Sequence, residues 1–288
     1  METYTDIYSY VKGQETNYQL PIDIMGWQWN MPSHVKKSFY YKHGRLLTGN
    51  SDDKPVKNIT RPILNLQYRT EDIDVKDIML YIDDPDKYHL SFLVKKYHDD
   101  VFVKKYNLDD FLDTLKISRI DYGGGLSKKG KGFPEVVPLE SIAFADQTDL
   151  LSGPIGIKHF YSPSQLKEME KSGWGKESNG ANCSIDELII LSAQEKQGVN
   201  GQISKTPGKY IEIYEVHGNM PANFLKDDPD EDEKYINQFQ IIAFYQKQDG
   251  EFQGVTLFKA EEKESPFKLT LRDPIYGRAL GFGGCEEL

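Results

Sequence analysis

The chain has 288 residues, enough to bury a substantial core in one large domain or two smaller ones. Its formal net charge of −10 argues against tight binding of a phosphate backbone, since each such contact normally uses Lys or Arg. With only Cys183 and Cys285, a disulfide framework and a thiolate metal site are excluded. No signal-peptide pattern and no apolar run of roughly 20 residues is present. These features predict a soluble protein of a reducing cytoplasm, and the acidic run 227–233 predicts a solvated loop.

The first 120 residues predict mostly helix. Residues 1–32 show no sustained period and predict an irregular arm, with Trp27 and Trp29 as docking points. Ser33 is a suitable cap for a helix that ends near Gly49. The side chains expected on one face of that helix are Val35, Phe39 and Leu46 or Leu47.

Three further helices and one strand are expected in this half. A helix opens at Thr60, with Pro62 tolerated in its first turn. Residues 86–106 predict a long helix with polar and aromatic faces, and residues 75–82 predict a strand. Asn107 caps a clearer helix, because apolar residues recur after it at helical spacing. These are Leu108, Phe111, Leu112 and Leu115.

The character of the sequence changes after residue 120. Residues 123–125 are three glycines that open a lysine-rich turn, and residues 135–137 predict the returning strand of a hairpin. Ser162 to Gln165 is a capping box for a helix closed by Gly173. Ser184 to Glu187 opens another helix running to about Lys196, followed by a polar loop at 198–208.

The remainder predicts strands at 210–216, 239–245, 255–259 and 267–271. In the last of these, Phe267, Leu269 and Leu271 alternate with polar residues. Helices followed by runs of strands indicate an α+β fold: a mostly helical part, then a strand-rich antiparallel part. We expect a helical region at 1–120 and an α+β region at 121–288. The final Glu-Glu-Leu predicts the first turn of a helix, so the chain is expected to be truncated before a long helix.

Residues 125–132 fall one residue short of a Walker A loop. That motif needs Ser or Thr after the lysine and a helix opening there, whereas Lys131 is followed by Gly132, Phe133 and Pro134. A flexible hairpin tip is the favoured interpretation over nucleotide binding. The lysines at 128, 129 and 131 predict a solvated loop, with contact to DNA as the alternative.

No catalytic, cofactor-binding or metal-binding residue is predicted. The six histidines show no spacing that places two ligands on one helix face: His34, His43, His89, His98, His159 and His217. The acidic segments 83–86 and 99–100 lack the ligand pattern of a calcium loop and are interpreted as turn and capping residues. Scattered carboxylates leave acid–base chemistry open without supporting it.

Several segments, in order, resemble one lineage of tailed-bacteriophage portal proteins. The first lies within 44–77 and contains Thr48 to Pro55 and Lys57 to Asn65. The later ones are 135–144 with 146–149 and Gly153-Pro154, then 158–174, 210–218, and 265–275 leading into Gly277-Arg278-Ala279-Leu280-Gly281. Each segment is a weak signal alone, and their ordered combination is more specific.

This resemblance implies the N-terminal, wing-type portion of a structural virion protein. Such a protein forms a ring, usually of twelve subunits, at one capsid vertex, through which DNA is packaged and ejected. The implied partners are further copies of the chain, the major capsid protein, the packaging motor, head–tail adaptors and translocating double-stranded DNA bound without sequence specificity. No membrane and no cofactor is implied. The implied location is the virion, and the host cytoplasm during assembly.

Head-to-tail ring contacts use two different faces of each subunit. We therefore expect the glycine-rich C-terminal segment and part of the strand-rich half to lie against neighbouring subunits. The alternatives are another phage head–tail adaptor or interaction protein with a tyrosine-rich surface and, ranked below it, a metal-dependent nucleic-acid-processing enzyme.

Overall fold

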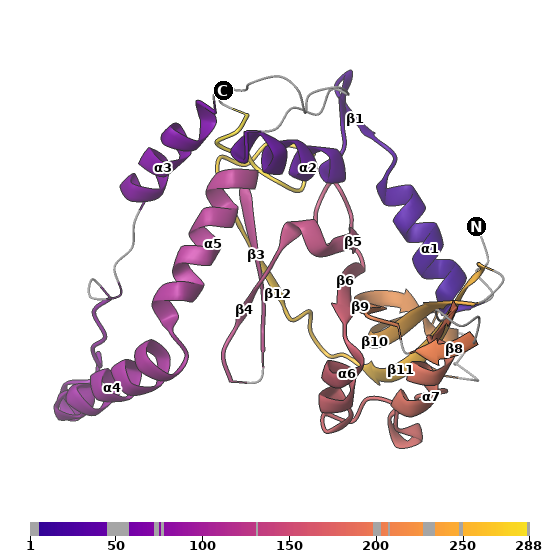
Figure 1. Ribbon diagram of the computed structural model, residues 1–288. Coiled ribbons are helices and arrows are strands. Elements are labelled where there is room, and N and C mark those ends of the chain that lie inside the picture. The colour runs from indigo at the N-terminus through magenta and orange to yellow at the C-terminus, as the bar shows by residue number, and fades with distance from the viewer. Residues whose placement is uncertain are drawn as a thin grey trace. The chain divides into compact units, whose positions relative to one another are not determined.

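The structure is a computed structural model (Figure 1) and describes residues 6–44, 58–71, 75, 78–130, 132–197, 203–206, 208–226, 234–247 and 250–286. Helices dominate up to residue 122, and antiparallel strands dominate after it. The predicted α+β fold is therefore confirmed. Among the described residues, no helix is long and apolar enough to cross a membrane.

Some predicted features lie outside the described residues. These are Leu46, Leu47, Gly49, the resembling segment 48–55 with Lys57, Lys131, most of the polar loop 198–208, the acidic run 227–233 and the final two residues.

Two compact units are built from interleaved parts of the chain. Unit 1 comprises Met1–Ile22 and Ser141–Ser265, and unit 2 comprises Asp23–Glu140 and Pro266–Leu288. The boundary expected between residues 120 and 121 falls inside unit 2, in helix α5 (Leu108–Tyr122). The division into 1–120 and 121–288 stays a prediction about domains.

Five antiparallel strands form the main sheet of unit 1, in the order β11-β10-β9-β6-β5. The predicted strands after residue 209 are confirmed and extend further than predicted, because polar residues continue them. Gln238 and Gln240 of β10 are buried, and their amides donate to backbone carbonyls. The strands are β5 (Ile142–Phe144), β6 (Ile155–Tyr161), β9 (Ile211–Pro221), β10 (Tyr235–Gln246) and β11 (Phe252–Glu261).

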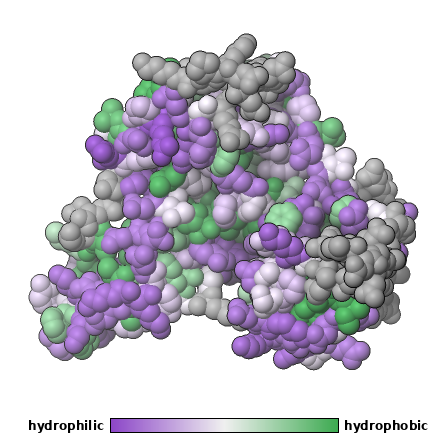
Figure 2. Space-filling view, in the orientation of Figure 1, coloured by the Kyte–Doolittle hydropathy of each residue, from purple (hydrophilic) through white to green (hydrophobic). Residues whose placement is uncertain are grey.

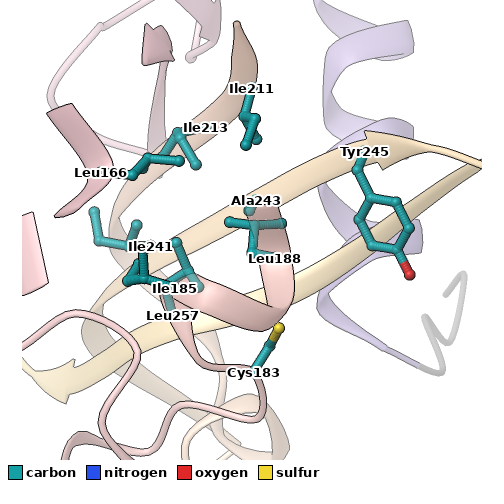
Figure 3. Packing of buried hydrophobic residues seen from close by; sticks show 10 residues of the cluster. All are labelled: Leu166, Cys183, Ile185, Leu188, Ile211, Ile213, Ile241, Ala243, Tyr245 and Leu257. Carbon is teal, nitrogen blue, oxygen red and sulfur yellow. The ribbon is translucent and has the colours of Figure 1, made fainter. Parts of the chain in front are cut away.

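One face of this sheet is covered by helices α6 (Pro163–Glu170) and α7 (Ile185–Leu191). Leu166 and Leu188 from these helices pack with Ile213 and Ile241 of the sheet, all essentially without exposed surface. Figure 3 shows these side chains pointing toward one another, with Ile185, Ile211, Ala243, Leu257 and others of the cluster. Burial of this apolar area is the main stabilising contribution to unit 1.

Helix α1 (Ile7–Tyr18) corrects the predicted irregular arm at 1–32. Asp6 caps it by accepting a hydrogen bond from the Ser9 amide, and its buried residues include Tyr10 and Val11. Tyr10 contacts the rings of Phe144 and Phe224. The helix was missed because polar residues at 14 and 15 interrupt the apolar face that begins at Ile7, which weakens the helical period.

The capping box at Ser162 and Gln165 is confirmed, and Gly173 has φ +97° beyond the end of α6. Ser184 caps α7, but that helix ends at Leu191 and not near Lys196, because residues 194–197 pair as β7 (Gln194–Gln197) with β8 (Ile203–Thr206). Short 3₁₀ turns complete unit 1 at η6 (Glu177–Asn179) and η7 (Ala222–Phe224).

Unit 2 is built on a three-stranded antiparallel sheet in the order β12-β3-β4. Its strands are β3 (Gly124–Lys128), β4 (Glu135–Val137) and β12 (Phe267–Leu271). The predicted hairpin at 123–137 and the alternating strand at 267–271 are both confirmed. A second hairpin, β1 (Ile22–Ile24) and β2 (Trp27–Trp29), turns at Met25 and Gly26, both with positive φ. A 3₁₀ turn, η5 (Leu139–Ser141), follows β4.

Helix α2 (Met31–Lys42) begins earlier than predicted. Asn30 and not Ser33 is its cap, because the Asn30 side chain accepts a hydrogen bond from the Ser33 amide. Its buried residues are Met31, His34, Val35 and Ser38, whereas Phe39 is exposed. Helix α3 (Thr60–Thr70) opens at Thr60 as predicted.

The predicted helix at 86–106 is helical along its length but changes type twice. It consists of a 3₁₀ helix, η3 (Pro85–Leu90), then α4 (Ser91–Tyr97), then a π-helix, η4 (His98–Lys105). Asn107 precedes α5 in the left-handed conformation and makes no side-chain cap, which corrects its predicted role. The strand predicted at 75–82 is also wrong, since residues 75 and 78–82, the described part of it, form no strand.

The glycine-rich C-terminal segment packs within unit 2. A Cβ atom at Gly281 would overlap the Arg272 carbonyl, and one at Gly123 would overlap the Gly281 carbonyl. The Gly281 amide donates to Gly123, and Leu280 has no exposed surface. The segment therefore packs against its own chain, while Tyr276 within it is exposed, and its contact with neighbouring subunits stays a prediction.

Candidate functional site

An aromatic cleft in unit 2 is formed by the β1–β2 hairpin, helix α2 and the C-terminal segment. Trp27 and Trp29 come from the hairpin, and Lys37 from α2, while Phe282 and Glu286 come from the end of the chain. The cleft has a volume of about 540 Å³. Ligand pockets commonly fall in the range of about 300–1,000 Å³, so its size suits a small molecule.

Arg278 holds the wall of this cleft together. Its side chain is fully buried and forms a two-point ion pair with Glu286, at 3.0 and 2.7 Å. It also donates to the Leu280 carbonyl, and its guanidinium lies 5.0 Å from the centre of the Trp29 ring. A planar guanidinium suits both contacts, because it binds a carboxylate at two points and stacks on aromatic rings.

His34 is buried beside this ion pair. Its Nε2–H donates to the Tyr122 carbonyl at 3.1 Å, and its Nδ1 lies 3.3 Å from Glu286. Burial lowers the pKa of His34, and the Glu286 carboxylate offsets that only in part. Burial alone would raise the pKa of Glu286, but the hydrogen bonds from Arg278 and the charges of His34 and Arg278 lower it. The imidazole therefore lies between the Tyr122 carbonyl and the Glu286 carboxylate, beside the arginine–glutamate pair.

Both cysteines are unsuited to nucleophilic chemistry. Burial, followed by nearby acidic side chains, raises the pKa of Cys183 and of Cys285 to about 11. A reactive cysteine needs a thiolate, which a raised pKa disfavours. Cys285 lines the cleft as a neutral thiol.

A second buried centre in unit 2 surrounds Asp121. Lys42 and Tyr68 both donate to its carboxylate. Burial raises the pKa of Asp121, and the hydrogen bonds from Lys42 and Tyr68 oppose that rise. The three side chains come from α5, α2 and α3, so this centre fixes three helices to one another.

In unit 1, two histidines share one glutamate on the face of the sheet that α6 and α7 cover. Glu215 lies 3.0 Å from Nε2 of His159 and 2.8 Å from Nε2 of His217. The other nitrogen of His217 lies 3.0 Å from Glu262, and its ring stacks on Phe239. Burial alone would lower the pKa of His217, but its hydrogen bonds to Glu215 and Glu262 raise it. His217 is thus a buried imidazolium between two carboxylates.

Of the other histidines, His43 lines a pocket with Lys42 and Asp121 of the second centre. His43 bonds to the Phe39 carbonyl, His98 lies beside Asp99, and His89 is exposed. Within the described part of the chain, no cluster of three His, Cys, Asp or Glu side chains is arranged to hold a metal ion. Spacing along the sequence could not reveal the His159–Glu215–His217 group, because strand pairing between β6 and β9 creates it.

The Walker-like segment is part of a hairpin, as predicted, but its first half is strand and not tip, since residues 124–128 form β3. Lys128 pairs with Glu135 at 2.8 Å and is 15% exposed, which corrects the solvated loop expected there. The Lys129 amide donates to the Pro266 carbonyl. Of the acidic segments, Asp84 caps η3 as predicted. Asp100 instead lies inside the π-helix, where it pairs with Lys104 at 2.6 Å.

A helical arm, residues 85–106, exposes several large apolar side chains of unit 2. None of the residues of η3, α4 and η4 is buried, and Phe92 and Leu93 are 71% and 58% exposed. The other exposed apolar residues of the arm are Tyr88, Val94 and Tyr97. Figure 1 shows α4 at the end of unit 2 away from α2, and Figure 2 shows both hydrophobic and hydrophilic residues on its visible face.

The base of this arm is firmly held. The ring of Phe133, in the β3–β4 turn, stacks on the ring of Tyr106 with 5.2 Å between the ring centres. It also contacts the ring of Phe111 edge-on and the ring of Phe102 in a tilted arrangement. The π-helix ends with the Tyr106 amide donating to Val101, a bond across five residues. The aromatic residues predicted on the faces of 86–106 therefore fall into two groups. One group packs at the base of the arm, and the other is exposed on α4.

No family model matches the chain, and no curated protein matches it either.

Proposed function

We propose that the chain is a non-enzymatic structural subunit of a closed homo-oligomeric ring of the phage-portal type. In this role it would stand at a capsid vertex of the virion and let double-stranded DNA pass. Two lines of support are independent of each other. One is the ordered set of portal-like segments in the sequence, and the other is the exposed helical arm at 85–106, which carries the proposal structurally.

The arm has the properties of a subunit contact. Its exposed residues are aromatic and aliphatic, and contiguous apolar patches on a monomer mark sites of association. Its anchored base means that little conformational entropy is lost when the tip binds. Aliphatic residues such as Leu93 and Val94 suit a protein surface better than a nucleic acid, where flat rings stack on bases.

The distribution of charge favours a second copy of this chain as the partner that binds the arm. Residues 85–106 contain five lysines and three aspartates, a net charge of +2, within a chain whose total is −10. The rest of the chain therefore carries −12. Including Asp83 and Asp84, the segment is neutral. Copies of an acidic protein repel one another, and a neutral or basic apolar arm is where that repulsion is weakest.

The remaining chemistry of the described residues supports a structural role. Three acidic side chains contact cations or hydrogen-bond donors of their own unit: Asp121, Glu215 and Glu286. Their charges therefore stabilise contacts between the helices, strands and C-terminal segment of that unit. A net acidic chain also suits a wall past which DNA moves without being held. The capsid protein, motor and adaptors are the partners that the portal resemblance implies.

Sedimentation of the protein at increasing concentration tests whether the arm mediates self-association. Leu93→Ser is expected to weaken self-association by about tenfold or more, as loss of a buried anchor does. Leu66→Ser is the matched control, since Leu66 lies on α3 and is 64% exposed, close to the 58% of Leu93. Equal association of both variants and the parent would contradict the proposal. Monomers that bind one other protein through the arm would instead favour an adaptor or interaction protein.

A further inference from the structure

One wall of the aromatic cleft of unit 2 contains a hydrogen-bond donor that has no partner among the described residues. Trp29 is 4% exposed, and its indole Nε1–H is buried with no hydrogen-bond partner among the described residues. A buried unpaired donor costs about 1–3 kcal/mol, so such groups are few in folded proteins. An acceptor brought into the cleft would supply the missing partner.

The walls of the cleft favour a flat ring. Trp27 is 49% exposed and Tyr41 is 40% exposed, and both line the cleft with Phe282. Aromatic faces in an open cleft bind planar rings by stacking, with little dependence on the identity of the ring.

The charge in the cleft favours an anion. Arg278 and Glu286 neutralise each other, and burial lowers the pKa of His34. Lys37 is exposed, lines the cleft and is the remaining cation among the described lining residues. A lysine beside stacked aromatic rings suits a phosphate or a carboxylate attached to the ring.

We propose that this cleft binds a planar aromatic ring that carries an anionic group, the chemistry of a mononucleotide. The ring stacks against Trp27, a ring nitrogen or carbonyl accepts the Trp29 hydrogen bond, and the phosphate contacts Lys37. This proposal does not depend on the ring assembly, because every group comes from unit 2 of one chain.

The test is a titration of the full chain, labelled with ¹⁵N at tryptophan, with adenosine monophosphate. The three indole signals are assigned with single Phe variants at residues 27, 29 and 174. Binding is expected to move the Trp29 indole proton downfield and slow its exchange, while the Trp174 signal stays in place. Adenosine, which lacks the charge, and inorganic phosphate, which lacks the ring, are each expected to bind about tenfold more weakly.

Lys37→Met tests how much the lysine charge contributes to binding, because it removes the charge at an exposed position where the fold should not change. The variant is expected to bind adenosine monophosphate about tenfold more weakly than the parent and to bind adenosine with unchanged affinity. Lys36→Met is the matched control, since Lys36 is the exposed neighbour on α2 and does not line the cleft. The proposal fails if millimolar nucleotide leaves the Trp29 signal in place. It also fails if Lys36→Met and Lys37→Met weaken binding equally, which would indicate nonspecific attraction to lysines.

Discussion

The guanidinium of Arg278 and the carboxylate of Glu286 form a two-point ion pair, with Nη1–Oε1 at 3.0 Å and Nη2–Oε2 at 2.7 Å. The Arg278 side chain has no exposed surface, and it joins the C-terminal segment to the β1–β2 hairpin of unit 2. A buried pair of this kind need not add net stability, but removing one partner strands the other charge.

Glu286→Gln is therefore expected to destabilise the protein by about 3 kcal/mol, because the guanidinium loses its counter-charge inside the protein. The midpoint of urea unfolding measures the change. Asp100→Asn removes one partner of an exposed pair with Lys104 and is expected to leave the midpoint unchanged. A midpoint equal to that of the parent for Glu286→Gln would show that the buried pair is not a structural requirement.

His217 is expected to make stability depend on pH. Its pKa is raised in the folded chain above the ordinary value of about 6.5, so the folded state holds the proton more tightly than the unfolded state. The resulting stabilisation is fully present below pH 6.5 and is lost as pH rises through the folded pKa. The difference in unfolding midpoint between the parent and His217→Gln should shrink from pH 6 to pH 9.

The exposed His89 provides the comparison for this experiment. His89→Gln, measured at the same pH values, gives the effect of replacing an exposed histidine, and the pH-dependent loss of stability is expected to be larger for His217→Gln. Direct titration of the His217 ring by NMR gives the decisive observation. A midpoint below 6.5 would show that burial outweighs the two carboxylates.

Gly281 is expected to tolerate no side chain. A Cβ atom there would overlap the Arg272 carbonyl, and the backbone cannot move away without breaking the bond from its amide to Gly123. Gly281→Ala should cost about 3 kcal/mol by overpacking. At Gly153 the nearest atom to an added Cβ is Asp146 Cβ at 3.5 Å, an ordinary contact, so Gly153→Ala should be nearly neutral. Equal thermal stability of the two variants would rule out this packing.

The two thiols are expected to react slowly while the chain is folded. Burial raises the pKa of Cys183 and Cys285 to about 11, which leaves little thiolate at pH 7. Reaction with a disulfide reagent should accelerate strongly when urea unfolds the protein. Rapid labelling of either cysteine in the native protein would contradict the raised pKa of the two thiols.

Some local signals in the sequence predicted the structure correctly, although the caps expected at Ser33 and Asn107 were wrong. The capping box at Ser162 and Gln165 lies within four residues, and the alternation at 267–271 is a local pattern, so both were predicted correctly. Helix α1 was missed because polar residues at 14 and 15 interrupt its apolar face. The type changes at 85–106 were missed because segments of 6, 7 and 8 residues are too short for the different periods of 3₁₀, α and π helices to be told apart.

The candidate sites depend on contacts that no local pattern contains. His34 meets Glu286 across 252 residues of sequence, and Glu215 meets His159 only through the pairing of β6 with β9. The apolar spacing of the arm indicates a helix but cannot say whether the apolar side is buried or exposed. Trp27 and Trp29 were predicted as docking points, and the structure places both at the cleft.

Electron microscopy in negative stain tests the central proposal most directly. The 288-residue chain would be imaged beside its Leu93→Ser and Leu66→Ser variants. We expect closed rings with a central hole for the parent chain, and their loss with Leu93→Ser but not with Leu66→Ser. Uniform small particles from the parent chain, at every concentration and salt condition, would contradict the proposal.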